Sequence, residues 1–314
     1  MSVATAGPSD VAARATSTAR RRSGWPGDGW IVLSLAGPAT FLMFVFIIGP
    51  VIAVTALSMT DYQLGAASLR FVGLDNYAQL FGDRTFQQSL RNTLIYVGVV
   101  VPGAVLLGLG VALLIETGTQ WRAFYRAVYF LPVMATLIAM AIVWEFMFHP
   151  SFGLVNLTLR LVGIQGMDWL QNRNSVLFTI AGIGVWQMLG FNMVLFMAGL
   201  TAIPRELYDA AAVDGVQDGW DRFWTVTWPM LAPVTLFVVV ISAIRSFQVF
   251  DVVHAITKGG PNKASEVLLH TMYSEGFGFF RTGYAAAITV VFLLFVLVLA
   301  LIKMRVLERR VHYS

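Results

Sequence analysis

Carboxylates are concentrated in one short stretch of this 314-residue chain. Five of its seventeen Asp and Glu residues fall within sixteen positions: Glu206, Asp209, Asp214, Asp218 and Asp221. Carboxylates form charge-assisted hydrogen bonds with Lys and Arg side chains of a partner. The stretch lies between two long apolar segments, and a plain connection between such segments needs only a few turn residues. We therefore predict a protein-docking surface here, and call residues 204–233 the acidic loop.

The local pattern of the acidic loop predicts two helices around a turn. Pro204 suits a first helical position, where its missing amide hydrogen is not needed, and 205–213 is rich in helix formers. Gly215 is placed to end this helix in a left-handed conformation. Asp218 is expected to cap the second helix, with Asp221 in its first turn.

An alternative is an amphipathic hairpin lying on the bilayer surface. Its aromatic anchors are Trp220, Phe223, Trp224 and Trp228. Surface-bound helices are usually rich in Lys and Arg, whereas this loop is acidic, so docking to a protein is favoured.

Four ionisable residues fall within otherwise apolar segments: Glu145, Arg245, Asp251 and His254. Charges inside a membrane are costly, and they mark functional sites or pair with one another. We expect Arg245 to pair with Glu145 or Asp251, and direct contact with a substrate is the alternative.

Amides and aromatic rings accompany these charges. Gln187 and Asn192 offer hydrogen bonds, and Phe247 and Phe250 offer apolar faces suited to sugar rings. For each of these residues, packing between helices is the competing interpretation. We predict a substrate path formed by Glu145, Gln187, Asn192, Arg245, Phe247, Phe250 and Asp251.

Patterns typical of enzymes are missing from the sequence. The segment 259–265 lacks the G-x-x-x-x-G-K-[ST] spacing of a phosphate-binding loop. The chain has no Cys, and its four His residues lack metal-ligand spacing. We therefore expect no catalytic residue, no metal and no cofactor in this chain.

Composition indicates an all-α membrane protein. Hydrophobic residues make up 57% of the chain and charged residues 12%, with a mean hydropathy of +0.72. A helix that spans the roughly 30 Å hydrocarbon core needs about 20 apolar residues. Six segments meet this length: 30–57, 92–115, 124–148, 174–200, 234–255 and 284–304. We predict a six-helix transmembrane domain over residues 30–314.

Basic residues predict the orientation of these helices. With both termini in the cytoplasm, twelve Lys and Arg residues lie on that side and eight on the other. The acidic loop then faces the cytoplasm as well. Residues 1–29 are expected to form a disordered cytoplasmic tail, and the net charge of +4 reflects topology, with no nucleic-acid partner.

The acidic loop resembles the cytoplasmic loop of binding-protein-dependent ABC importers, written E-A-A, three residues, G, nine residues, an apolar residue and L-P. Here Asp209-Ala210-Ala211 stands for E-A-A, Gly215 holds the glycine, and Trp228-Pro229 replaces L-P. Further segments are similar to sugar and glycerol-3-phosphate permeases: 191–204, 250–261, 272–277 and 309–313. The chain is thus similar to permease subunits of the carbohydrate-uptake class in the bacterial plasma membrane.

The resemblance implies a coupling helix that contacts an ATPase through Glu206, Asp209, Ala210, Ala211, Asp214 and Gly215. It also implies a second homologous permease, a cytoplasmic ATPase dimer that binds ATP and Mg²⁺, an extracytoplasmic solute-binding protein and surrounding lipid. This chain itself is not expected to be an enzyme.

The substrate is the least determined part of this interpretation. A neutral sugar or oligosaccharide is favoured, because Asp251 would repel phosphate. Glycerol-3-phosphate or a related phosphodiester is the alternative, with Arg245 as the deep cation. A proton-coupled secondary transporter using Glu145, Asp251 and His254 is less favoured, since such proteins usually carry internal repeats.

Overall fold

The computed structural model describes residues 28–118, 121–216 and 219–310. The elements within these ranges are helices, which confirms the predicted all-α fold class. The chain divides into two units, residues 1–53 and 54–314. The predicted tail over 1–29 falls almost wholly outside the described residues, as does the predicted cap Asp218.

The first unit contains α2 (Asp28–Met43), the π-helix η1 (Phe44–Ile48) and the start of α3 (Gly49–Leu57). These helices join into one candidate membrane span, Ser34–Leu57, and none of its residues is buried. A helix that is apolar on all sides belongs in an apolar surrounding. The span therefore fits a membrane segment.

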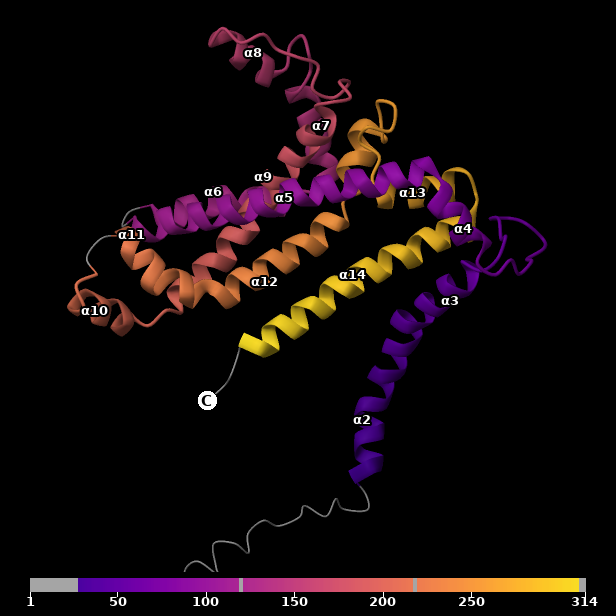
Figure 1. Ribbon diagram of the computed structural model, residues 1–314, viewed down its shortest axis with the longest axis horizontal. Coiled ribbons are helices and arrows are strands. Elements are labelled where there is room, and N and C mark those ends of the chain that lie inside the picture. Colours follow the sequence, from indigo (N-terminus) through magenta and orange to yellow (C-terminus); the bar gives the residue numbers. More distant parts are fainter. Residues whose placement is uncertain (1–27, 119–120, 217–218, 311–314) are drawn as a thin grey trace, which may run out of the picture. The chain divides into compact units, whose positions relative to one another are not determined.

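The second unit is a bundle of helices (Figure 1). Its membrane-spanning helices are α5 (Arg84–Thr117), α9 (Val176–Thr201), α12 (Trp228–Phe247) and α14 (Thr282–Arg310). Shorter helices connect or cover them: α4 (Asp75–Gly82), α6 (Arg122–Met134), α7 (Leu137–Met147), α8 (Leu154–Leu161), α10 (Arg205–Val213), α11 (Gly219–Arg222), η2 (Phe223–Thr227), η3 (Val253–Thr257), α13 (Leu268–Tyr273) and η4 (Ser274–Gly278).

Small residues let the helices of this bundle approach closely. A Cβ at Gly190 on α9 would lie 2.0 Å from the carbonyl oxygen of Tyr129 on α6, and one at Gly108 on α5 would lie 2.8 Å from the Cβ of Asn192. Membrane helices associate through such close packing because lipid supplies no hydrophobic driving force between them. Helix α9 therefore holds both α5 and α6.

The start of α5 is tied to α14 by a capping carboxylate. Asp83 accepts hydrogen bonds from the Thr85 amide at 2.7 Å and from the Tyr284 hydroxyl at 2.8 Å. Burial alone would raise the pKa of Asp83, but these hydrogen bonds and the nearby charge of Lys263 outweigh it and hold the pKa below its ordinary value.

The third predicted span, 124–148, differs from the structure. It is broken into α6 and α7, whose axes bend by 100° at Ala135–Thr136. Pro132 removes a backbone hydrogen bond from the last turn of α6. The described residues therefore contain five helices long enough to span a membrane, or six if this bent pair counts as one.

The fifth predicted span, 234–255, also has different ends. The helix starts earlier, at Gly219, and ends at Phe247. Beyond it the chain turns and buries Val249, Val252 and Val253 in the core around α9. This burial competes with continuation of the helix, so Phe250, Asp251 and His254 do not belong to α12.

The close contact between α9 and α6 yields a stability prediction. Gly190→Ala should destabilise the fold by about 1–3 kcal/mol, because the new methyl group collides with backbone. Gly182→Ala on the same helix is the matched control, since its Cβ would meet nothing within 4 Å. Thermal unfolding of both variants in detergent measures the difference, and equal midpoints would contradict the packing described.

Candidate functional site

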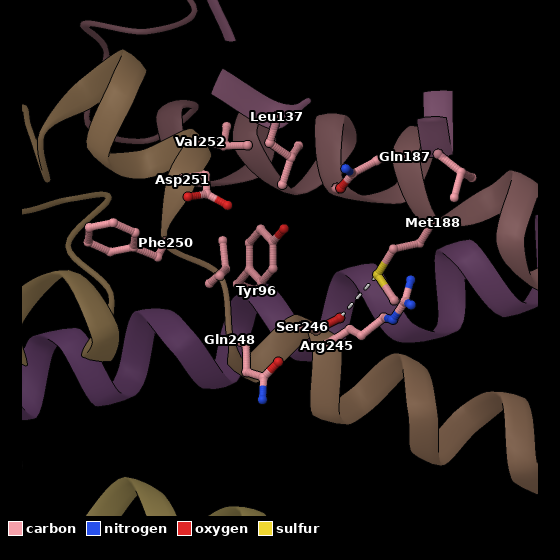
Figure 2. Close-up of a pocket in the computed structure, with 13 residues that line it drawn as sticks. Tyr96, Leu137, Gln187, Met188, Arg245, Ser246, Gln248, Phe250, Asp251 and Val252 are labelled. Carbon is pink, nitrogen blue, oxygen red and sulfur yellow. Dashed lines mark hydrogen bonds between the residues drawn. The ribbon is translucent and has the colours of Figure 1, made fainter. Parts of the chain in front are cut away.

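A pocket of about 240 Å³ lies where α12 ends against α5, α6, α7 and α9. The residues around it come from five segments of the chain (Figure 2). They are Tyr96, Val133, Leu137, Gly184, Gln187, Met188, Arg245, Ser246, Gln248, Val249, Phe250, Asp251 and Val252. A cavity that combines apolar walls with several convergent polar groups is typical of a small-molecule site.

The polar groups of this pocket are mostly neutral. Gln187 and Gln248 contribute carboxamides and Tyr96 a phenol, with Asp251 as the carboxylate. Gly184 makes room for the phenol, because a Cβ there would lie 2.2 Å from the Tyr96 hydroxyl oxygen. The arrangement offers several donors and acceptors to a ligand rich in hydroxyl groups.

The guanidinium of Arg245 stacks on an aromatic ring in the structure. Its Cζ lies 4.1 Å from the centre of the Phe191 ring. Within the described ranges, no ion pair joins Arg245 to Glu145 or Asp251, so the expected pairing is wrong. Arg245 instead lines the pocket, and neither of these two carboxylates neutralises its charge.

Three residues of the predicted substrate path lie away from the pocket. Asn192 is buried, and its Oδ1 accepts a 3.1 Å hydrogen bond from Ser242, which joins α9 to α12. Phe247 is buried and stacks on Phe295 of α14 at 6.2 Å. Glu145 is exposed on α7. The pocket thus contains Gln187, Arg245, Phe250 and Asp251 of that prediction.

Sequence reasoning missed Tyr96, Ser246 and Gln248 as lining residues. Tyr96 and Ser246 resemble ordinary polar residues of a membrane helix. Gln248 carried the clearest signal, since a carboxamide follows Phe247 within an apparently continuous apolar segment. Its role depends on the end of α12 at Phe247, which the sequence pattern did not indicate.

The acidic loop ends its first helix with a glycine, as predicted. Gly215 has φ +91°, its amide donates to Ala212, and the Val216 amide donates to Ala211 at 2.9 Å. These two bonds form a Schellman motif. Pro204 is the residue before the helix and not its first residue.

One face of α10 is exposed and acidic. Glu206, Asp209, Ala210 and Val213 follow the i, i+3, i+4, i+7 spacing of one helix face, and all four are exposed, as are Asp214 and Gly215. Ala211 is instead buried under the helix, within the apolar cluster that includes Leu200 and Ile203.

Two contacts hold α10 onto the following helices. The Tyr208 hydroxyl lies 3.1 Å from that of Thr227, and the Arg222 guanidinium lies 4.4 Å from the Tyr208 ring centre. A helix of nine residues is marginal by itself. Its orientation therefore depends on this packing. The acidic loop and the segment around α13 lie at opposite ends of the unit (Figure 1).

Comparison with known proteins identifies the family. The model of the inner membrane component of binding-protein-dependent transport systems matches residues 93–313. The chain belongs to this family. It is therefore a multi-pass membrane protein and a transport permease, which agrees with the absence of enzyme patterns from the sequence.

Individual relatives are similar over nearly the whole chain. The sn-glycerol-3-phosphate transport system permease protein UgpA of Agrobacterium fabrum is 33% identical and covers 89% of this chain and 95% of its own. The probable ABC transporter permease protein YurN of Bacillus subtilis is 32% identical, covering 87% and 94%. Because the chain belongs to the binding-protein-dependent transport family, the alternative of a proton-coupled secondary transporter has no support.

A solved structure is similar in fold. It is a bacterial ABC transporter involved in the import of the acidic polysaccharide alginate, with a TM-score of 0.78 at 20% identity. The match covers 90% of this chain and 96% of the other. The all-α membrane bundle is thus the fold of an ABC transporter permease.

The end of α10 yields a prediction about the permease alone. Gly215→Ala should weaken the Schellman motif by about 1–2 kcal/mol, because an alanine resists a left-handed conformation. Amide hydrogen exchange of 211–216 should accelerate in the variant. Gly219→Ala is the control, since its Cβ would meet nothing within 4 Å and its φ is not in the left-handed region. Unchanged exchange in Gly215→Ala would refute the role of this glycine.

Proposed function

We propose that this chain forms half of the substrate path of an ATP-driven importer of a sugar or oligosaccharide. The pocket carries the proposal, because its carboxamides, phenol and Phe250 ring suit hydroxyl groups and the apolar faces of sugar rings. A second, homologous permease supplies the other half of the path. Residues 30–314 act as its transmembrane domain.

A phosphorylated substrate is the second candidate. Arg245 lines the pocket, and the similar UgpA proteins are named for sn-glycerol-3-phosphate transport. Phosphate recognition relies on charge-assisted hydrogen bonds from such a guanidinium. Against this candidate, Asp251 brings negative charge to the same pocket, and Arg245 is already stacked on Phe191.

We infer that the exposed face of α10 docks into a cleft of a cytoplasmic ATPase. Its carboxylates Glu206, Asp209 and Asp214 are available to basic groups of that partner, and Ala210 permits close approach. Ala211 and Gly215 contribute by holding and ending the helix. Two such ATPases bind ATP and Mg²⁺ and perform the hydrolysis.

This docking places the acidic loop and both termini in the cytoplasm, in agreement with the distribution of Lys and Arg. A solute-binding protein then delivers substrate at the opposite end of the bundle. The family description supports such a partner. So does a similar alginate transporter, whose structure contains a periplasmic protein bound to an alginate pentasaccharide.

The docking face is testable by charge reversal. Asp209→Lys with Asp214→Lys should lower ATP-dependent uptake by about tenfold or more, equivalent to about 1.4 kcal/mol of lost coupling. The ATPase should also co-purify less well. Asp221→Lys in the same loop is the control, because Asp221 is exposed but lies on α11. Intact co-purification and uptake in the double variant would disprove the docking role.

Arg245 distinguishes the two substrate classes. For a neutral sugar, Arg245→Gln should change the half-saturation of uptake by less than about twofold. For a phosphorylated substrate, the variant loses charge-assisted hydrogen bonds worth about 1.5–3 kcal/mol. The substrate concentration at half-saturation should then rise by about 10- to 150-fold. Arg245→Lys keeps the charge and serves as the control. Uptake of maltose and of glycerol-3-phosphate by reconstituted transporter measures both cases.

A further inference from the structure

A chain of aromatic rings extends from the pocket to the surface. Phe250 lines the pocket, and its ring centre lies 5.2 Å from that of Tyr273. Tyr273 in turn lies 5.3 Å from Phe277. Phe250 stands at the margin of the pocket, with its ring directed away from Tyr96 (Figure 2). The three rings therefore continue the pocket outward.

The exposure of these rings increases away from the pocket. Phe250 is half-buried, Tyr273 is 38% exposed and Phe277 is 64% exposed. Successive ring planes are tilted by 58° and 34°, so the rings do not cover one another completely. Tyr273 and Phe277 thus keep ring surface open to a ligand, next to the half-buried Phe250.

The local backbone fixes this row. Tyr273 ends α13 and Phe277 belongs to the π-helix η4, four residues later, so both side chains project from one continuous helical segment. Below them, Glu266 accepts hydrogen bonds from His270 at 2.8 Å and Thr271 at 2.9 Å, all three buried. A π-helical turn is often found at functional sites.

We propose that Phe250, Tyr273 and Phe277 form a stacking track for the sugar rings of an oligosaccharide, whose leading unit enters the pocket. The proposal rests on the proposed function and specifies its substrate class. The rings follow one another at 5.2–5.3 Å, comparable with the length of one unit of a sugar chain. The pocket of about 240 Å³ is small, so further units must lie outside it.

Chemistry favours a carbohydrate over a phosphorylated glycerol on this track. The apolar faces of sugar rings pack on aromatic faces, whereas a compact phosphate seeks cations and backbone amides. Around the track, the Phe250 ring also stacks on His254, with centres 5.0 Å apart. No Lys or Arg forms a cation–ring contact with these rings in the described part of the chain.

The test uses the assembled transporter, with its partner permease and ATPases, in lipid nanodiscs. Saturation-transfer NMR measures the binding of linear α- and β-linked glucose oligomers, from the monomer to the hexamer. Tyr273→Ala and Phe277→Ala should each weaken hexamer binding by about 2- to 10-fold, as expected for loss of one aromatic contact. Binding of glucose itself should not change, and Phe277→Trp should restore the hexamer.

Phe279→Ala is the matched control. Phe279 is 67% exposed, and it has no ring contact in the part of the chain that the structure describes. Equal weakening by Phe279→Ala, or equal weakening for glucose and hexamer, would overturn the track. So would alanine variants that impair only the binding of a protein partner, because the rings would then belong to a protein interface.

Uptake by the same transporter, reconstituted into lipid vesicles together with its solute-binding protein, separates the two proposals. One outcome is that the wild-type transporter takes up oligomers although its binding affinity does not depend on their length. That result would overturn the track but leave the proposed importer function standing. ATP-dependent uptake of glycerol-3-phosphate but of no oligomer would overturn the sugar assignment together with the track.

Discussion

The close approach of α9 to its neighbours is the constraint on which the rest of the unit depends. Gly190 brings the α9 backbone against α6, and Gly184 leaves space that the Tyr96 hydroxyl of α5 occupies. With a larger residue at Gly190 the helices would separate, because steric overlap with backbone cannot be relieved by rotating a side chain. A larger residue at Gly184 would displace the Tyr96 side chain. The pocket exists because α5, α6 and α9 are held at this distance.

The end of α12 at Phe247 is the second determinant of the site. The following turn buries three valines, directs Asp251 to the pocket and places Phe250 at its margin. A helix continued to residue 255 would instead have pointed these two adjacent side chains about 100° apart around a membrane span. Breaking the helix therefore converts residues of an apolar segment into the wall of a cavity, where irregular backbone is tolerated because protein surrounds it.

The sequence predicted the membrane helices and the acidic loop because both depend on local composition. Gly215 could be read as a helix end from its position alone, and the structure gives it the expected left-handed backbone. The pocket depended on contacts between distant segments. Asn192 and Arg245 looked equally suited to a substrate, yet Asn192 joins two helices while Arg245 lines the cavity. Only the rotation of each helix about its axis decides between these outcomes.

The same two helices reach both the acidic loop and the pocket. Helix α9 carries Gln187 beside the pocket and leads into α10, while α12 begins within the loop at Trp228 and carries Arg245 in its last turn, near the pocket. At about 1.5 Å per residue, α12 spans about 30 Å. The loop is packed on both helices through Tyr208, Ala211 and Val226, so it cannot rotate as a separate body without disturbing this core. The core thus joins α10 to both α9 and α12, the two helices that bring Gln187 and Arg245 to the pocket.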